Sequence, residues 1–409
     1  MKPPSDAGLL RGRGNIDSGK VSFIELFFDL IFVFAVTQLS HSFLDNLTMQ
    51  GTVELVLLTM AVWWVWIFTA WVINSFNAET RQIRLMLIVL MLLGLIMSAS
   101  IPEAFASTGL YFAGAYTVFQ VGRTAFTVWM LRRDAKELRI NFIRILLWLS
   151  ASGVLWIAGG AMEDSSRLAI WTAAILLEYA APSLGFWVPG LGRTPTSVWN
   201  VEGSHMAERC GLFIIIALGE SILLMGATFA ESVWNFSTLA AFGSAFVVTV
   251  ALWWIYFDAT AKTGHDYIAH SSDPGRLARS AYTYTHLLLV AGIIVTAVAG
   301  ELLLAHPTGH TGAMTAAVML GGPGLFLLGN ALFIYIVAGV AALPYFTGLM
   351  VLLLLSLIAG SVSPLVLSVL VAVVLIGVSV WGHGFSERLR KRSSTGMTHE
   401  ETSVFDSDM

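Results

Sequence analysis

Several ionisable side chains lie inside apolar segments that are long enough to cross a membrane. Each charge at the bilayer centre costs about 2.5–3.5 kcal/mol on insertion scales, so such residues usually face the interior of a helix bundle or a water-filled cavity. Carboxylates and histidines there can bind protons or cations, whereas guanidiniums can hold anionic groups. The candidates for binding a substrate or an ion are Glu25, Asp29, Arg123, Glu178, Arg209, Glu220 and His286.

Glu25 and Asp29 are four residues apart and therefore share one face of a predicted helix with Phe32 and Val36. At 1.5 Å per residue, Asp29 lies about 12 Å from the predicted cytoplasmic end of its span. Arg123 in the fourth predicted span reaches a similar depth. The sequence therefore predicts an Asp29–Arg123 ion pair.

Arg209 and Glu220 are eleven residues apart, a rotation of about 20° on a helix, so they lie on one stripe but are too distant to bond each other. Glu220 thus needs another partner, water or a proton. Glu178 has no cation beside it in sequence, and His286 is the histidine predicted to exchange protons inside the membrane. Structural alternatives stay open at each position: Glu25 at the head groups, the arginines as helix clamps, and His286 as an interhelical hydrogen bonder.

The composition of the whole chain excludes a soluble globular protein. Of 409 residues, 56% are hydrophobic and 12% charged, with a mean hydropathy of +0.77, whereas soluble domains are about 25% charged. The net charge of −4 lacks the excess of basic residues that is typical of nucleic-acid-binding proteins. The single cysteine, Cys210, excludes an intrachain disulfide and a cysteine metal cluster. We therefore expect membrane lipids as partners and no nucleic acid.

Apolar segments of about 20 residues predict an all-α polytopic membrane protein with about twelve transmembrane helices. The predicted spans are 21–43, 53–76, 82–105, 108–131, 141–161, 168–188, 205–229, 237–260, 278–304, 312–337, 340–360 and 362–385. Nineteen of the 22 Lys and Arg residues then fall on one side, which predicts that both termini are cytoplasmic. Between 312 and 385 no charged loop separates the spans, and a count of eleven or thirteen stays open.

The sequence also predicts an internal repeat. The segment around Glu25 corresponds to the one around Glu208, and VWWVWIFTA at 62–70 corresponds to LWWIYFDAT at 252–260. The predicted domains are a cytoplasmic tail 1–20, a six-helix repeat 21–188, a cytoplasmic linker 189–204, a second six-helix repeat 205–385, and a disordered cytoplasmic tail 386–409. Two copies with six spans each have one orientation and are parallel repeats.

No P-loop, dinucleotide fingerprint, HExxH or GxSxG motif is found in the sequence. His306 and His310 have no carboxylate or thiol at ligand spacing. We therefore expect no cofactor and no metal, and ATP-driven transport and common hydrolase chemistry lack support.

Two motifs resemble the bacterial low temperature requirement protein A family: FIELFFDLIFVFAVTQLSH in the first span and ERCGLFIIIALGESIL in the seventh. The matching positions are Glu25, Phe28, Asp29, Gln38, Glu208, Arg209, Gly219, Glu220 and Ser221. The resemblance covers about residues 21–385. It implies a multi-span protein of the bacterial cytoplasmic (inner) membrane and supplies no agreed activity.

Three functions are consistent with these observations. The best supported is secondary transport or permeation of a small solute or ion, with Glu220, Asp29 and His286 binding a proton or cation. The second is an intramembrane enzyme that acts on a lipid or isoprenoid, with Glu220 or Asp29 as general acid. The third is a non-catalytic membrane stress-response scaffold whose charges only clamp helices. Catalysis is the less favoured expectation; the substrate, the coupling ion and the oligomeric state are not readable.

Overall fold

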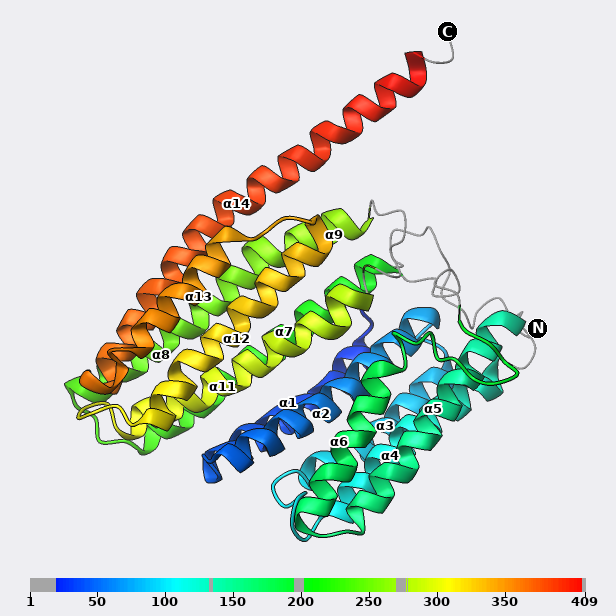
Figure 1. Ribbon diagram of the computed structural model, residues 1–409, viewed down its shortest axis with the longest axis horizontal. Helices are drawn as coiled ribbons and strands as arrows, with labels where there is room; N and C mark the ends of the chain where they lie inside the picture. Colours follow the sequence, from blue (N-terminus) through cyan, green and yellow to red (C-terminus); the bar gives the residue numbers. More distant parts are fainter. Residues whose placement is uncertain (1–19, 132–134, 195–201, 270–276, 278, 407–409) are drawn as a thin grey trace. The chain divides into compact units, whose positions relative to one another are not determined.

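The computed structural model describes residues 20–131, 135–194, 202–269, 277 and 279–406. These residues form helices joined by loops, and no β-strand occurs within these ranges (Figure 1). A helix satisfies its backbone N–H and C=O groups within its own segment, which hydrocarbon requires because it contains no water. The predicted all-helical class is confirmed.

The chain divides into two compact units, residues 1–209 and 210–409. The helices of the first unit are α1 (Phe23–Asp45), α2 (Met49–Ser75), α3 (Arg81–Ala99), α4 (Gly109–Met130), α5 (Lys136–Gly160) and α6 (Asp164–Ala180). Helix α7 (Gly203–Glu231) runs across the boundary. The second unit contains α8 (Phe236–Trp254), η3 (Ile255–Thr260), α9 (Ala261–Ala269), η4 (Arg279–Thr285), α11 (His286–Ala305), α12 (Ala313–Ala338), α13 (Leu343–Ser356), η5 (Ala359–Ser361) and α14 (Pro364–Asp406).

Within the described ranges, nine helical segments are long and apolar enough to cross a bilayer, so the chain is a multi-pass membrane protein. The other three predicted spans correspond to α4, α6 and α13. Helix α6 has 17 residues and α13 has 14, which gives lengths of about 26 and 21 Å against a hydrocarbon core of about 30 Å. Twelve crossings, the two repeats and the cytoplasmic termini stay predictions.

In the first unit, α4 packs between α3 and α5, and α1 packs against α2 and α3. Helix α2 is the most enclosed of the candidate spans, with 89% of its apolar window buried. Its tryptophans contribute to this core, and Trp63, Trp64 and Trp66 are almost fully buried. A buried helix beside α1 and α4 is positioned to bond any polar side chain that those helices turn inward.

In the second unit, α11 and α12 approach closely because glycines lie where they meet. A Cβ atom on Gly292 would lie 2.6 Å from the backbone nitrogen of Phe326, and one on Gly322 would lie 2.7 Å from that of Thr296. Small residues allow such backbone contact between membrane helices. Pro323 follows Gly322 and has no N–H, so the carbonyl of Met319 lacks its usual donor within α12.

Helix α14 continues beyond its apolar part to Asp406, as the long helix near the C-terminus in Figure 1. This differs from the predicted disorder of 386–409, of which 407–409 lie outside the described residues. The segment contains no proline, and Ser386 is followed by five strong helix formers, Glu387, Arg388, Leu389, Arg390 and Lys391. Extension of a helix that is already nucleated needs little further stabilisation. The predicted tail 1–20 is described only at Lys20.

Candidate functional site

The first turn of α1 fixes the carboxylate of Glu25. The backbone N–H and the hydroxyl of Ser22 both donate to Glu25 Oε2 at 2.8 Å. A side chain that accepts from the residue before the helix satisfies an N–H with no helical acceptor. Glu25 Oε2 thus accepts hydrogen bonds at the start of α1, and Glu25 Oε1 bonds residues of α7.

Arg209 of α7 joins two turns of α1. Its Nη1 donates to Glu25 Oε1 at 3.2 Å, and its Nη2 donates to Asp29 Oδ1 at 2.6 Å. The i, i+4 spacing of the two acids lets one guanidinium reach both. Trp66 of α2 donates its Nε1–H to Asp29 Oδ1 at 2.8 Å, and its ring centroid lies 5.5 Å from the Arg209 guanidinium carbon. All four side chains are buried.

Asn74, near the C-terminal end of α2, fixes the ring of His205. Asn74 Oδ1 accepts the backbone N–H of Glu202, and Asn74 Nδ2 donates to the Glu202 carbonyl, each at 2.9 Å. The amide therefore has one orientation, and its second N–H faces His205 Nδ1 at 3.2 Å. That nitrogen must accept, so the proton is on Nε2, which donates to Glu25 Oε1 at 2.9 Å. In this arrangement the imidazole is neutral.

We call Glu25, Asp29, Trp66, Asn74, His205 and Arg209 the ionic cluster. Its two carboxylates, one guanidinium and neutral imidazole together carry a charge of −1. Asp29 Oδ2 is buried and has no hydrogen-bond partner among the described residues. An ionised oxygen without a partner is costly in a low-dielectric interior. Asp29 is therefore the member of the cluster best placed to accept a proton or a cation.

The predicted Asp29–Arg123 ion pair is wrong, because Asp29 bonds Arg209 instead. Arg123 is buried in α4, where its Nη1 donates to Thr69 Oγ1 at 2.9 Å and to the Val65 carbonyl at 3.3 Å. The Nε and Nη2 atoms of Arg123 have no partner within the described ranges. Equal depth along two helices does not determine which side chains face each other, and α2 supplies the acceptors that Arg123 reaches.

Glu178 of α6 accepts hydrogen bonds from three side chains. The Tyr116 hydroxyl donates to its Oε2 at 2.5 Å, and Ser152 Oγ and Trp156 Nε1 donate to its Oε1 at 2.6 and 3.0 Å. The residue lacks a cation beside it in sequence, and α4 and α5 meet its oxygens with neutral donors. Glu178 therefore has the contacts of a structural residue that joins three helices.

The other two candidates, Glu220 and His286, lie in the second unit and are both buried. His286 Nε2 bonds the Tyr256 hydroxyl at 2.9 Å, and its Nδ1 lies 3.2 Å from the Ala281 carbonyl. These contacts are those of the interhelical hydrogen bonder considered above. Glu220 precedes Ser221, which lines a cavity described below.

Sequence reasoning missed His205, Trp66 and Asn74. His205 is four residues before Arg209, so the spacing that grouped Glu25 with Asp29 also places these two side chains on one face of α7. His205 is thus a second buried histidine beside His286, and proton exchange at His286 stays a prediction. Trp66 is buried in the core of the first unit, and its Nε1–H also has a polar role as a donor to Asp29.

These features define an all-helical, multi-pass membrane protein that holds buried ionisable groups in its helical interior. Residues 20–380 match the family described as Bacterial low temperature requirement A protein (LtrA), and the chain belongs to this family. A protein of Rhizobium meliloti (strain 1021), described as uncharacterized, is 38% identical over 380 residues, which are 93% of each chain. No solved structure matches the chain.

Proposed function

We propose that this protein is a secondary transporter or permeation protein for a small solute or ion, and that Asp29 binds the proton or cation that moves with it. The observation that carries the proposal is the environment of Asp29. One carboxylate oxygen is held by Arg209 and Trp66, whereas the other is buried without a partner within the described ranges. Carboxylates in such intramembrane positions commonly mark ion paths and proton relays.

The charge of the ionic cluster supports the same conclusion. Binding of one proton or monovalent cation at Asp29 brings the sum of its side-chain charges from −1 to zero. Asn74 holds His205 in its neutral form, so Asp29 rather than the imidazole is the site of that binding. A side chain whose charge changes on binding can alter the helix contacts that it makes, here those of α1 with α2 and α7.

The contacts of Arg123 support the proposal that an anionic group is transported as a second species or forms part of the substrate. Its Nε and Nη2 atoms form one edge of the guanidinium fork, the geometry that binds a carboxylate or phosphate through two parallel hydrogen bonds. Within the described ranges no carboxylate lies at ion-pair distance from Arg123. We assign Arg123 as a candidate contact for substrate and Asp29 as the coupling site.

The test is charge displacement by the full-length protein in proteoliposomes on a solid-supported membrane. A rapid acidification should give a transient current in the wild type, because proton binding at Asp29 moves charge within the protein. Asp29→Asn should abolish this current. Asp45→Asn should retain it, because Asp45 is an exposed aspartate on the same helix.

Equal currents from wild type and Asp29→Asn would contradict the assignment of Asp29. No current from either, together with a loss of thermal stability in Asp29→Asn, would favour the scaffold function. The enzyme alternative instead requires that expression change the lipid or isoprenoid products of the cell and that Asp29→Asn reverse the change.

A further inference from the structure

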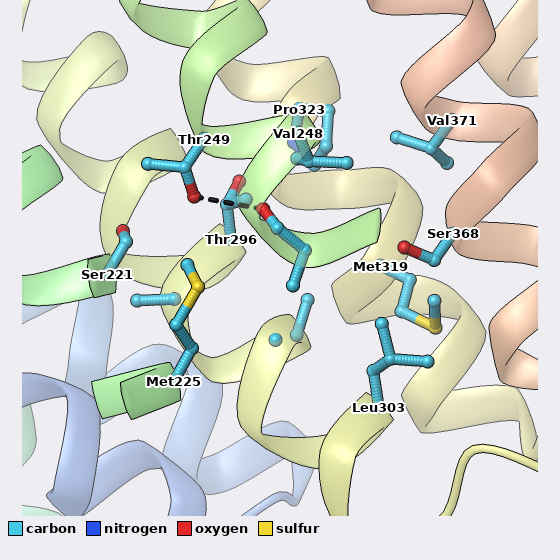
Figure 2. Close-up of a pocket in the computed structure, with 14 residues that line it drawn as sticks. Ser221, Met225, Val248, Thr249, Thr296, Leu303, Met319, Pro323, Ser368 and Val371 are labelled. Atoms are coloured by element: carbon cyan, nitrogen blue, oxygen red, sulfur yellow. Dashed lines mark hydrogen bonds between the residues drawn. The ribbon is translucent and has the colours of Figure 1, made fainter. Parts of the chain in front are cut away.

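The second unit contains a cavity of about 30 Å³ that lies among α7, α8, α11, α12 and α14 (Figure 2). This volume is enough for roughly two water molecules. Most of the lining is apolar, and four hydroxyl groups interrupt it: Ser221, Thr249, Thr296 and Ser368. All four side chains are at least nine-tenths buried. Because this cavity lies wholly within residues 210–409, it is separate from the ionic cluster.

The hydroxyl groups present lone pairs to the cavity, because most of their protons are already used. Thr249 donates to the Ala245 carbonyl at 3.1 Å, and Thr296 donates to the Gly292 carbonyl at 2.7 Å. Figure 2 shows the Thr249 bond as a dashed line. A hydroxyl has one proton and two lone pairs, so these two groups can only accept from an occupant.

The proton of the Ser368 hydroxyl is also in use, in a hydrogen bond to its neighbour Ser244. The Ser244 hydroxyl donates to the Ala241 carbonyl at 2.9 Å, so in the 3.0 Å contact between the two serines Ser368 is the donor. Ser221 Oγ is buried and has no hydrogen-bond partner in the described part of the chain. An unsatisfied buried hydroxyl costs about 1–3 kcal/mol.

Helix α12 adds a fifth acceptor next to these hydroxyls. Met319 and Pro323 both line the cavity, and the missing N–H of Pro323 leaves the Met319 carbonyl without its donor in the helix. The described residues that line the cavity include no basic side chain that could serve instead as a donor.

The lining suits an occupant that carries positive charge, because its hydroxyl oxygens are acceptors and its described side chains include no basic group. Ca²⁺ and Mg²⁺ bind mainly through carboxylate ligands, and no carboxylate is among the lining residues. A monovalent cation can be bound by neutral oxygen ligands alone, so it fits this lining.

We propose that this cavity binds a monovalent cation of sodium or potassium size, coordinated by the hydroxyl oxygens of Ser221, Thr249, Thr296 and Ser368 and by the Met319 carbonyl. The site is independent of the function proposed for Asp29. It lies near the middle of α11 and α12, so its occupation stabilises the turn of α12 before Pro323 against its neighbours.

The experiment measures binding to the purified full-length protein with radiolabelled sodium, and with rubidium in place of potassium. Thermal unfolding is followed in parallel in NaCl, KCl or choline chloride at constant ionic strength. We expect saturable binding of one ion and a higher midpoint temperature in NaCl or KCl than in choline chloride. Thr249→Val and Thr296→Val, which keep the side-chain volume, should each weaken binding by about tenfold, equivalent to loss of one oxygen ligand.

Thr263→Val is the matched control. Thr263 is fully buried in the same unit, donates to the Ala259 carbonyl at 2.9 Å and does not line the cavity. Its substitution should leave cation binding unchanged. If the valine variants do not fold, Ser221→Ala tests the site, because it removes the hydroxyl that makes no hydrogen bond.

Three results would overturn the proposal. Identical stability in all three salts without tracer binding would mean that the cavity holds water only. Equal losses in Thr263→Val would mean that the effect is not local. Binding that is lost in Asp29→Asn but kept in the hydroxyl variants would place the ion in the ionic cluster. Retained binding in Asp29→Asn, with its proton current abolished, supports both proposals separately.

Discussion

The two arginines of the first unit show how different the surroundings of a buried guanidinium can be. Arg209 bonds two carboxylates and lies over Trp66. Arg123 bonds a threonine and a carbonyl and keeps two nitrogen atoms without partners in the described ranges. The two terminal nitrogen atoms of Arg209 are held by carboxylates and only its Nε has no partner in the described ranges, so this guanidinium stabilises the helices that it joins. Arg123 has a whole unused edge, which can bind something further. This contrast is the reason why we assign the two residues different roles.

Replacing Arg209 should destabilise the protein far more than replacing Asp29. Arg209→Met leaves Glu25 and Asp29 as two buried carboxylates without their guanidinium, which should cost about 3–5 kcal/mol. Asp29→Asn keeps one oxygen for Trp66 and Arg209 and removes the excess negative charge, so its cost should stay within about 1 kcal/mol. The measurement is the free energy of unfolding in detergent.

A suitable control for Arg209→Met is Arg84→Met. Arg84 pairs with Glu79, and half of its side chain is exposed, so the loss should be about 0–1 kcal/mol. If Asp29→Asn proves as destabilising as Arg209→Met, Asp29 is a structural clamp and the charge argument fails.

Glu178 should tolerate an amide but not an apolar side chain. In Glu178→Gln one oxygen still accepts from Ser152 and Trp156, and the Tyr116 hydroxyl can turn to accept from the new N–H. In Glu178→Leu three buried donors lose their acceptor, which should cost about 3 kcal/mol or more. Thermal unfolding measures both. A large loss in the Gln variant would mean that the carboxylate charge itself is required.

The candidate residues of the site were predictable in part, because a charge within an apolar segment is visible in a single sequence. Glu25, Asp29 and Arg209 were identified in this way and lie together. Their partners Trp66 and Asn74 were not identifiable, because tryptophan and asparagine occur in membrane helices for other reasons. The pairing of Asp29 with Arg209 depends on which helices are neighbours, and no local pattern contains that information.

At the scale of helices, the close approach of α11 and α12 has a direct consequence for two adjacent glycines. Gly322→Ala places a Cβ 2.6 Å from Thr296 Oγ1 and 2.7 Å from its backbone nitrogen, so the helices must separate at a cost of about 1–3 kcal/mol. Gly321→Ala is the matched control, since its Cβ would meet nothing within 4 Å. Gly321→Ala should be neutral or stabilising by up to about 1 kcal/mol. Equal unfolding midpoints for the two variants would contradict the observed packing.

The positions of the helices were largely predictable, because apolar length is a strong signal. Each predicted span overlaps a helix, and nine helical segments in the described ranges are long and apolar enough to cross, whereas the count of twelve crossings stays a prediction. The helical continuation of α14 to Asp406 was not expected. Composition indicated too little apolar surface for folding there, but a helix that starts within the membrane needs no new nucleus to extend. For short helices such as α13 the prediction is less complete, because apolar composition alone does not say whether a helix of 14 residues crosses the membrane.

For the whole molecule, the distribution of Lys and Arg makes a prediction about sidedness. In a Cys210→Ser background we expect His310→Cys and Met162→Cys to react with a membrane-impermeant maleimide from outside intact cells. Arg193→Cys should react only after lysis. All three positions are exposed loop residues, whereas Cys210 is buried and contributes no background. Equal labelling of Met162→Cys and Arg193→Cys would mean that α6, which lies between them, does not cross.

The contact of Asn74 with both backbone groups of Glu202 joins residues that are 128 positions apart in the chain. The same amide also donates toward His205 Nδ1. A proton on that nitrogen would place two hydrogen-bond donors opposite each other with no acceptor between them. The amide would have to rotate to remove this conflict, and rotation would break the two hydrogen bonds that tie Glu202, the residue directly before α7, to the end of α2. The hydrogen-bond state of one imidazole ring is therefore linked to how firmly Glu202, at the start of α7, is held against α2.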